Sequence, residues 1–176
     1  MIVESFSAND TYQFGRLLGE KLKPGAVVCL DGDLGVGKTV FVKGVAAGLG
    51  ITEPVVSPTF TIVCEYKEGR IPMYHMDVYR IEDPEELYEI GYEEDHFGDG
   101  VCLIEWSELI RELIPAEAIR VKIAKDLDKG LSYRSISVDF GGAEEAMDET
   151  SGDLKFRAGC FCRGAHGGHG ACRVLR

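Results

Sequence analysis

Apolar positions along the chain fall into two kinds of pattern. Short continuous apolar runs bounded by turn residues are typical of buried strands, whereas apolar residues three and four apart indicate a helix that packs on one side. Strands are predicted over Ile2–Phe6, Ala26–Leu30, Thr61–Lys67, Met73–Tyr79, Val101–Trp106, Ile119–Ala124 and Ser132–Phe140. Because helical patterns alternate with these strands, the sequence predicts an α/β fold with a mixed, mainly parallel sheet flanked by helices.

Helix starts are predicted from capping residues. Ser7 or Asn9 can accept a hydrogen bond from the first turn of a helix that runs to about Leu22. Asp83 and Pro84 supply a cap and a proline at the first helical position, so another helix is predicted to begin there. Two further helices are predicted over Lys38–Leu49 and Ser107–Ile114.

The composition is that of a globular protein with one sizeable domain. The chain has 176 residues, of which 45% are hydrophobic and 28% are charged. No apolar stretch approaches the roughly 18 residues needed to span a bilayer. The acidic Glu4 lies where a signal peptide would carry basic residues. We therefore expect a soluble cytoplasmic protein that does not act at a membrane.

Charge divides the chain into two parts. The net charge is −11, and such a surface repels phosphate backbones, which argues against nucleic-acid binding by this chain alone. All of this charge lies in residues 1–140, whereas residues 141–176 carry equal numbers of acidic and basic residues. The second part contains eight glycines and no sustained apolar period. We predict one folded domain over residues 1–140 and a disordered tail over 141–176.

The predicted tail contains a cluster of soft metal ligands. These are Cys160, Cys162, His166, His169 and Cys172. Four such ligands suffice for a tetrahedral zinc site, although the opening C-x-C spacing differs from that of standard zinc fingers. Zinc binding and a disordered appendage are both compatible with this composition.

The strongest chemical signal is an eight-residue loop. Gly32-Asp33-Leu34-Gly35-Val36-Gly37-Lys38-Thr39 matches the pattern G-x-x-x-x-G-K-[ST], and it follows an apolar strand and begins a helix. Glycines in this pattern allow backbone N–H groups to converge on phosphate oxygens, aided by the partial positive charge of the helix N-terminus. Lys38 would then contact the β- and γ-phosphates, and the Thr39 hydroxyl would bind Mg²⁺. The sequence therefore predicts a P-loop NTPase fold with a nucleoside triphosphate and Mg²⁺ as cofactors.

Two acidic residues are candidates for the chemistry of this site. Glu105 ends an apolar strand, where a P-loop protein places a carboxylate for Mg²⁺, although an exposed glutamate at a strand end is the simpler alternative. Asp77 could bind a metal-bound water or orient an attacking water, or it could pair with Arg80. His75 and Tyr79 share the strand face of Asp77, so they could support it or simply pack in the core.

Two further features lie near these motifs in the sequence. The segment Ser57-Pro58-Thr59-Phe60 follows the loop by about 20 residues, where many nucleotide switches sense the γ-phosphate, but a plain Ser-Pro turn would look the same. Trp106 is the only tryptophan of the chain, and on its own it is most simply a packing residue.

Together these motifs resemble a known family. GDLGVGKT, SPTF, YHMDVYR followed by DPEEL, and LIEW occur in the order and spacing of the bacterial tRNA threonylcarbamoyladenosine biosynthesis ATPase family, TsaE, over about Ile2–Phe140. The resemblance implies a small P-loop ATPase that works with the TsaB and TsaD proteins, which modify adenosine 37 of tRNA. It implies contact with tRNA only through that complex, with ATP and Mg²⁺ as cofactors.

The resemblance also implies roles for individual residues. Lys38, Asp77 and Glu105 match the catalytic positions of the family, and Thr39 and Glu105 match its metal ligands. The nucleotide-binding positions are matched by Asp33, Leu34, Gly35, Val36, Gly37, Lys38, Thr39, Ser57, Thr59 and Trp106. The nucleotide base is expected near Ser7–Thr11, without assignment of individual side chains. The tail over 141–176 is a departure, because family members usually end soon after the last strand.

Two other functions remain open at the level of the sequence. A small P-loop kinase would need an acceptor pocket and several arginines over the phosphates, and residues 1–140 show no arginine cluster. A scaffold that binds ATP and assembles partners without turnover would use the same loop, so the residues separate it poorly from a slow ATPase.

Overall fold

The computed structural model describes residues 1–81, 83, 86–89, 98–143, 147 and 174–175. The strands are β1 (Ile2–Ser5), β2 (Val27–Asp31), β3 (Val63–Tyr66), β4 (Met73–Asp77), β5 (Val101–Glu105), β6 (Ile119–Lys125), β7 (Arg134–Asp139) and β8 (Val174–Leu175). The helices are α1 (Ala8–Gly19), α2 (Lys38–Gly48) and α3 (Glu86–Glu89), with two 3-10 helices, η1 (Ser107–Leu113) and η2 (Leu127–Lys129).

The strands form one mixed sheet with the order β3-β4-β5-β2-β6-β7-β1-β8. The four adjacent strands β4, β5, β2 and β6 run parallel, and the remaining pairs are antiparallel. Parallel strands place their carboxyl ends at one edge of a sheet, and the segment after β2 is the loop Gly32–Gly37. The predicted α/β fold with a mixed sheet is confirmed, and the loop that carries the phosphate-binding pattern lies at the edge where β4 and β5 also end.

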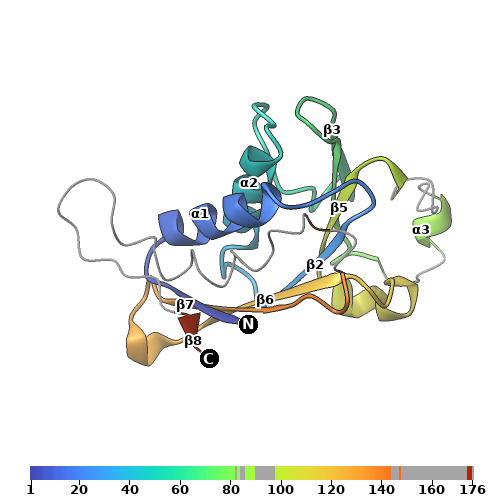
Figure 1. Ribbon diagram of the computed structural model, residues 1–176. Helices are drawn as coiled ribbons and strands as arrows, with labels where there is room; N and C mark the ends of the chain where they lie inside the picture. The colour runs from blue at the N-terminus through green and yellow to red at the C-terminus, as the bar shows by residue number, and fades with distance from the viewer. Residues whose placement is uncertain (82, 84–85, 90–97, 144–146, 148–173, 176) are drawn as a thin grey trace.

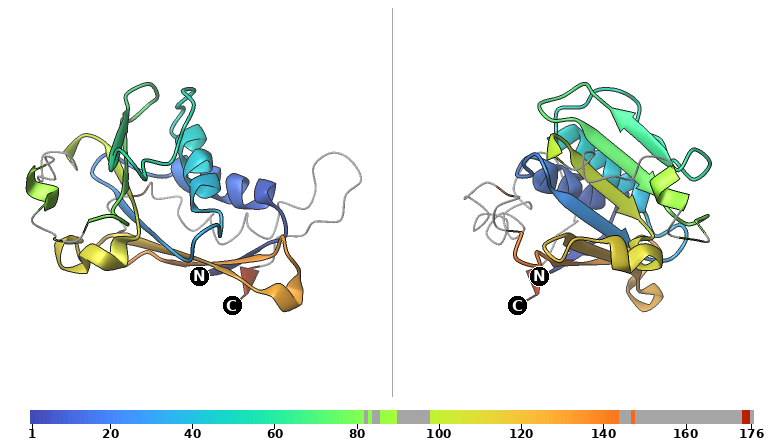
Figure 2. Two further views of the ribbon diagram at one scale, coloured as in Figure 1. Left: turned by 180° about the vertical axis from the view of Figure 1, so that it is seen from behind. Right: turned by 90° about the vertical axis from the view of Figure 1, so that its right-hand side faces the viewer.

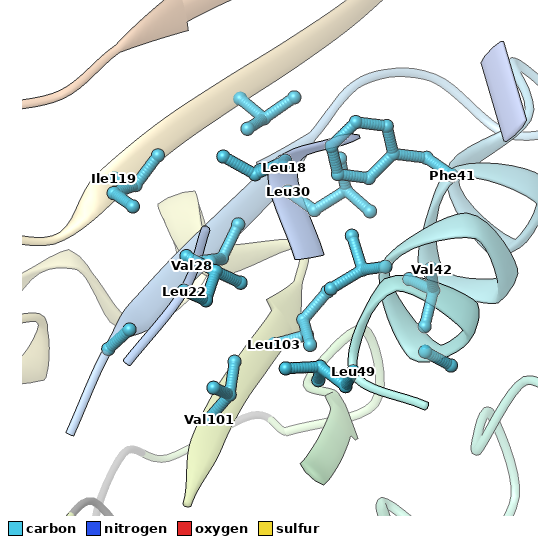
Figure 3. Packing of buried hydrophobic residues seen from close by; sticks show 14 of the residues in the cluster. Leu18, Leu22, Val28, Leu30, Phe41, Val42, Leu49, Val101, Leu103 and Ile119 are labelled. Atoms are coloured by element: carbon cyan, nitrogen blue, oxygen red, sulfur yellow. The ribbon is translucent and has the colours of Figure 1, made fainter. Parts of the chain in front are cut away.

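The two faces of the sheet are covered by different elements. Helices α1 and α2 lie together over one face (Figures 1 and 2). Val28 and Leu30 of β2 pack into the core beneath them, together with Phe41 of α2 (Figure 3). Val27 and Cys29, which alternate with these residues, belong to a second core with Ile110 of η1 and Leu87 of α3. Successive residues of a strand point to opposite faces, so residue parity decides which core each side chain joins.

Helices α1 and α2 pack so closely that the backbone of one helix contacts the backbone of the other. Each carries two glycines four residues apart, namely Gly15 and Gly19 in α1 and Gly44 and Gly48 in α2. A β-carbon on any of the four would collide with a carbonyl oxygen of the opposite helix. The glycines are therefore required for the close packing of this helix pair, which fixes where α2 and its N-terminus lie relative to the sheet.

Most predicted elements are present, with differences at their ends. The first helix was predicted to reach Leu22, and this is wrong, because α1 ends at Gly19. The guanidinium of Arg70 donates 2.6 Å hydrogen bonds to the carbonyl oxygens of Gly19 and Leu22, so acceptors at and just after the helix end are paired by a side chain. Ser107–Leu113 is a 3-10 helix with a non-helical residue at Ile110.

Only a few residues after Phe140 are described. Met147 is buried and forms an isolated bridge with Leu22, and β8 pairs with β1 and forms the edge of the sheet. The five candidate zinc ligands lie outside the described residues, as does Pro84 of the predicted helix start. Among the described helices, none has both the length and the apolar character required to cross a membrane.

Candidate functional site

The loop Gly32–Gly37 joins the end of β2 to the start of α2. Gly32 has a φ of 137°, and a β-carbon there would collide with the carbonyl oxygen of Ile123. Gly37, with a φ of 108°, is the N-cap of α2 and provides no side-chain cap. The first backbone N–H groups of α2 are therefore not capped by a side chain at this position. An exposed loop followed by an uncapped helix N-terminus is a suitable binding site for phosphate groups.

Lys38 is held inside this loop. Its side chain is only 5% exposed, and its Nζ donates hydrogen bonds of 2.7 Å to the Gly32 oxygen and 3.2 Å to the Asp33 oxygen. Burial lowers the pKa of Lys38, and the nearby carboxylates, foremost Glu105 and Asp77, oppose that decrease. The lysine therefore lies near carboxylates that favour its charged form.

Glu105 and Asp77 lie side by side at the ends of β5 and β4. They are register partners in the parallel pair, and both are buried. Glu105 follows Val101 and Leu103 on the strand face that packs toward α2, so its carboxylate is directed to the same side of the sheet as the P-loop. The structure thus brings together Lys38, Glu105 and Asp77, three positions that the sequence singled out.

The segment Ser57–Thr59 is hydrogen bonded to Asp77. The Thr59 hydroxyl donates to Asp77 Oδ2 at 2.9 Å, and the hydroxyls of Ser57 and Thr59 are 2.9 Å apart. The backbone N–H of Tyr79 donates to Asp77 Oδ1 at 3.1 Å. Both oxygens of Asp77 therefore have donors, and its hydrogen bond to Thr59 joins the end of β4 to the segment predicted to sense a γ-phosphate.

Trp106 forms one wall of the site. The Lys38 Nζ lies 3.8 Å from the centre of its indole ring, and the Tyr79 ring packs against it with centroids 4.9 Å apart. Trp106 has a φ of 64° and a ψ of 32°, a left-handed conformation that is strained for a bulky residue. A hydrogen bond from its N–H to the Leu30 oxygen supports this backbone. Trp106 is therefore not an ordinary core residue, because it contacts the lysine of the P-loop.

Some residues at the site were not found from the sequence. Arg134 of β7 donates its Nε–H to the Val36 oxygen at 2.7 Å and so supports the loop from 98 positions away. The Ser107 hydroxyl lies 3.0 Å from both carboxylate oxygens of Asp31 and shares its single O–H between them, which links the end of β2 to η1. Neither residue belongs to a local motif, so only the fold reveals these contacts.

The predicted base-binding segment Ser7–Thr11 lies at the start of α1. Ser7 caps the helix, with its hydroxyl accepting from the N–H of Asp10 at 3.1 Å. The Thr11 hydroxyl is buried and lies 2.8 Å from that of Ser5. These contacts account for the helix start, and the location of the base stays a prediction.

The oxygen donors of the site suit Mg²⁺ bound with a nucleotide. Thr39 is half-buried in the first turn of α2, and Glu105 and Asp77 provide carboxylates at the neighbouring strand ends. Mg²⁺ in phosphate-binding sites commonly takes one or two protein oxygens and completes its coordination with phosphate and water. Thr39 and Glu105 are therefore the residues that would hold the metal, with Asp77 adjacent.

Comparison with known proteins finds similarity to one family. The family model described as threonylcarbamoyl adenosine biosynthesis protein TsaE matches residues 5–135. The chain is 47% identical over 129 residues to a Bacillus subtilis protein named tRNA threonylcarbamoyladenosine biosynthesis protein TsaE, covering 72% of this chain and 80% of the relative. A Treponema pallidum protein of the same name is 46% identical over 119 residues, covering 68% and 87%.

A solved structure is similar over most of the chain. The crystal structure of Bacillus subtilis YdiB superposes with a TM-score of 0.68 and 37% sequence identity, covering 89% of this chain and 95% of that one. The matched family region contains the P-loop, Ser57–Thr59, Asp77, Glu105 and Trp106, the residues that the fold assembles at one edge of the sheet. The chain belongs to the TsaE family of threonylcarbamoyl adenosine biosynthesis proteins.

Proposed function

We propose that this protein is a Mg²⁺-dependent ATPase that acts in the biosynthesis of threonylcarbamoyladenosine in tRNA. The observation that carries the proposal is the placement of Lys38 between the P-loop carbonyls and the carboxylates of Glu105 and Asp77. A structural lysine would be expected at the surface, whereas this one is buried at the start of a helix whose N-cap is a glycine. Membership of the TsaE family supports the biosynthetic assignment.

Each residue has a part in ATP hydrolysis under this proposal. Lys38 exchanges its hydrogen bonds to loop carbonyls for charge-assisted bonds to the β- and γ-phosphates. Thr39 and Glu105 would hold Mg²⁺, which when bound would neutralise phosphate charge. Asp77 orients the attacking water. Its hydrogen bond to Thr59 connects the γ-phosphate site to Ser57–Thr59, so the position of this segment depends on whether a γ-phosphate is bound.

The protein partners in this proposal are TsaB and TsaD. With a net charge of −11, this chain would repel tRNA at long range, so tRNA is handled by the partner proteins. ATP hydrolysis on this chain then drives turnover of the TsaB–TsaD complex, and the threonylcarbamoyl transfer itself takes place on the partners. The proposed location is the cytoplasm, where these partners and tRNA occur.

The test is ATP hydrolysis with and without Mg²⁺, measured for the protein alone and with purified TsaB and TsaD. Lys38→Ala removes the phosphate-binding amine, and loss of a charge-assisted hydrogen bond of about 1.5–3 kcal/mol corresponds to at least roughly tenfold weaker binding or turnover. Lys43→Ala is the matched control, because Lys43 lies on the exposed side of the same helix. Hydrolysis that increases when TsaB and TsaD are added, disappears in Lys38→Ala and persists in Lys43→Ala supports the proposal.

Two other results would replace the proposal by its alternatives. Rapid turnover that is indifferent to TsaB and TsaD, together with phosphorylation of a small acceptor, would indicate a kinase. Partner assembly that depends on ATP binding but continues at full activity without any hydrolysis would indicate a scaffold.

A further inference from the structure

His75 is buried beneath the proposed catalytic edge of the sheet. It lies in the middle of β4 with no exposed surface, and its Nε2 is 2.9 Å from Glu105 Oε1. In the register of β4 and β5, His75 is opposite Leu103 and Asp77 is opposite Glu105. The imidazole therefore reaches diagonally, on one face of the sheet, to the carboxylate that is proposed to bind Mg²⁺.

The hydrogen-bond partners assign the proton of this imidazole. A carboxylate accepts hydrogen bonds, so Nε2 carries the hydrogen that points to Glu105. In the part of the chain that the structure describes, His75 Nδ1 is the one buried side-chain nitrogen or oxygen without a hydrogen-bond partner. An apolar side chain would fill the same space without leaving such an atom, so core packing alone does not explain a histidine here.

The two adjacent carboxylates have separate sets of donors. Asp77 accepts from the Thr59 hydroxyl and from the Tyr79 backbone. For Glu105, His75 is the hydrogen-bond donor that the described residues provide to its side chain. Because a glutamate side chain has several rotatable bonds, a bond to one oxygen restricts its orientation and leaves the second oxygen for another ligand.

We propose that His75 is a positioning residue that holds the Glu105 carboxylate in the orientation needed to bind Mg²⁺ together with the nucleotide. The inference rests on the proposed function, because it assigns Glu105 to the metal. It predicts that His75 contributes to the Mg²⁺-dependent part of nucleotide affinity and not to the part provided by the P-loop and Lys38. Groups that orient metal ligands commonly change metal affinity by about 10- to 100-fold when they are lost.

The experiment compares His75→Met with His75→Gln. Methionine fills similar space without a donor, whereas the glutamine side-chain amide can place an N–H near the position of Nε2. Nucleotide affinity is measured for ADP, once in EDTA and once over a Mg²⁺ titration. Because Trp106 is the only tryptophan and lies 3.8 Å from the Lys38 Nζ, its fluorescence is the readout. The wild-type protein and Glu105→Gln serve as references.

We expect His75→Met and His75→Gln to bind ADP in EDTA as tightly as the wild-type protein does, because neither substitution changes the P-loop or Lys38. His75→Met should need about tenfold more Mg²⁺ for half-saturation, close to the value for Glu105→Gln, and His75→Gln should recover most of the loss. An unchanged Mg²⁺ requirement in His75→Met would overturn the inference. If His75→Met does not fold, His75→Gln is compared with His75→Asn. The shorter asparagine amide should not reach Glu105, so His75→Asn should need more Mg²⁺ for half-saturation than His75→Gln.

The experiment also separates this inference from the proposed function. If the wild-type protein gains no ADP affinity from Mg²⁺, the proposed metal site itself is wrong and the role of His75 is wrong with it. If the wild-type protein gains affinity and Glu105→Gln abolishes the gain while His75→Met keeps it, only the positioning role is refuted.

Discussion

Gly44→Ala places a methyl group into the contact between α1 and α2. Its β-carbon would lie 2.9 Å from the Tyr12 carbonyl carbon and 3.0 Å from the Arg16 nitrogen, and still closer to the Tyr12 oxygen. Ordinary contacts of a β-carbon are 3.4–4 Å, so the helices must separate by several tenths of an ångström or more. The obstacle is backbone on a packed helix, which cannot rotate away as a side chain would.

The magnitude follows from two opposing effects. Alanine is favoured over glycine inside a helix by about 1 kcal/mol, whereas overpacking a buried contact costs about 1–3 kcal/mol and occasionally more. Because the collision here is with backbone, we expect the upper part of that range and a net loss of about 2 kcal/mol. For a protein of this size, that corresponds to a decrease in Tm of about 4–8 °C.

The substitution should also weaken nucleotide binding. Lys38 is the first residue of α2, so a helix displaced from α1 carries the N-terminal N–H groups and the P-loop lysine away from Glu105. Thermal unfolding and ADP titration, both followed by circular dichroism or Trp106 fluorescence, measure the two effects. Gly98→Ala is the matched control, because a β-carbon there meets no atom within 4 Å.

The opposite stability change would refute this reasoning. If Gly44→Ala raised Tm, the helix propensity of alanine would outweigh the collision, and the glycines of α1 and α2 would not be needed for close packing. If Tm fell and ADP affinity were unchanged, the packing argument would stand, but the link from the helix contact to the P-loop would be wrong.

Two further predictions concern groups away from the P-loop. Burial raises the pKa of the Cys29 and Cys102 thiols, so a smaller fraction of each is thiolate at pH 8 than in a free cysteine. Iodoacetamide labelling followed by peptide mass spectrometry should therefore leave both cysteines unmodified in the native protein and modify both in urea. Rapid labelling of the native protein would contradict their burial. Tyr133→Phe removes a buried 2.7 Å hydrogen bond to Glu4 Oε1, and we expect the free energy of unfolding measured by urea titration to fall by about 1.5–3 kcal/mol. Tyr79→Phe, at an exposed tyrosine, is the control, and equal stability of the two variants would contradict the prediction.

Much of the fold could be predicted from the sequence because its signals are local. The apolar run before Gly32, the glycines of the loop and the helical pattern after Lys38 together indicate a strand, a phosphate-binding loop and a helix. Their predicted bounds agree with β2 and α2 within one residue at each end. The end of α1 was missed, and the Gly19 carbonyl oxygen at this end is paired with Arg70, a residue 51 positions away that no local pattern reveals.

The site was predicted as a list of residues but not as an arrangement. Sequence motifs identified Lys38, Asp77 and Glu105, yet the pairing of Asp77 with Glu105 depends on the register between β4 and β5. Register is set by side-chain burial across the sheet, so no segment contains that information by itself. The support of Val36 by Arg134 is long-range in the same sense. Trp106, interpreted as a packing residue when considered alone, contacts Lys38 because β5 ends beside the start of α2.

The charge of Lys38 helps explain how two buried carboxylates can lie side by side at the ends of β4 and β5. Glu105 and Asp77 repel each other at neighbouring strand ends, and Lys38 is the cation whose charge both of them favour. When Lys38 turns to the phosphates of a nucleotide, that compensation decreases, and the two carboxylates need another cation. In the proposed function Mg²⁺ arrives with the nucleotide and meets this need. Under the proposed function, the same two carboxylates would couple the lysine to the metal, and we therefore expect ADP to bind with different affinities in EDTA and with Mg²⁺.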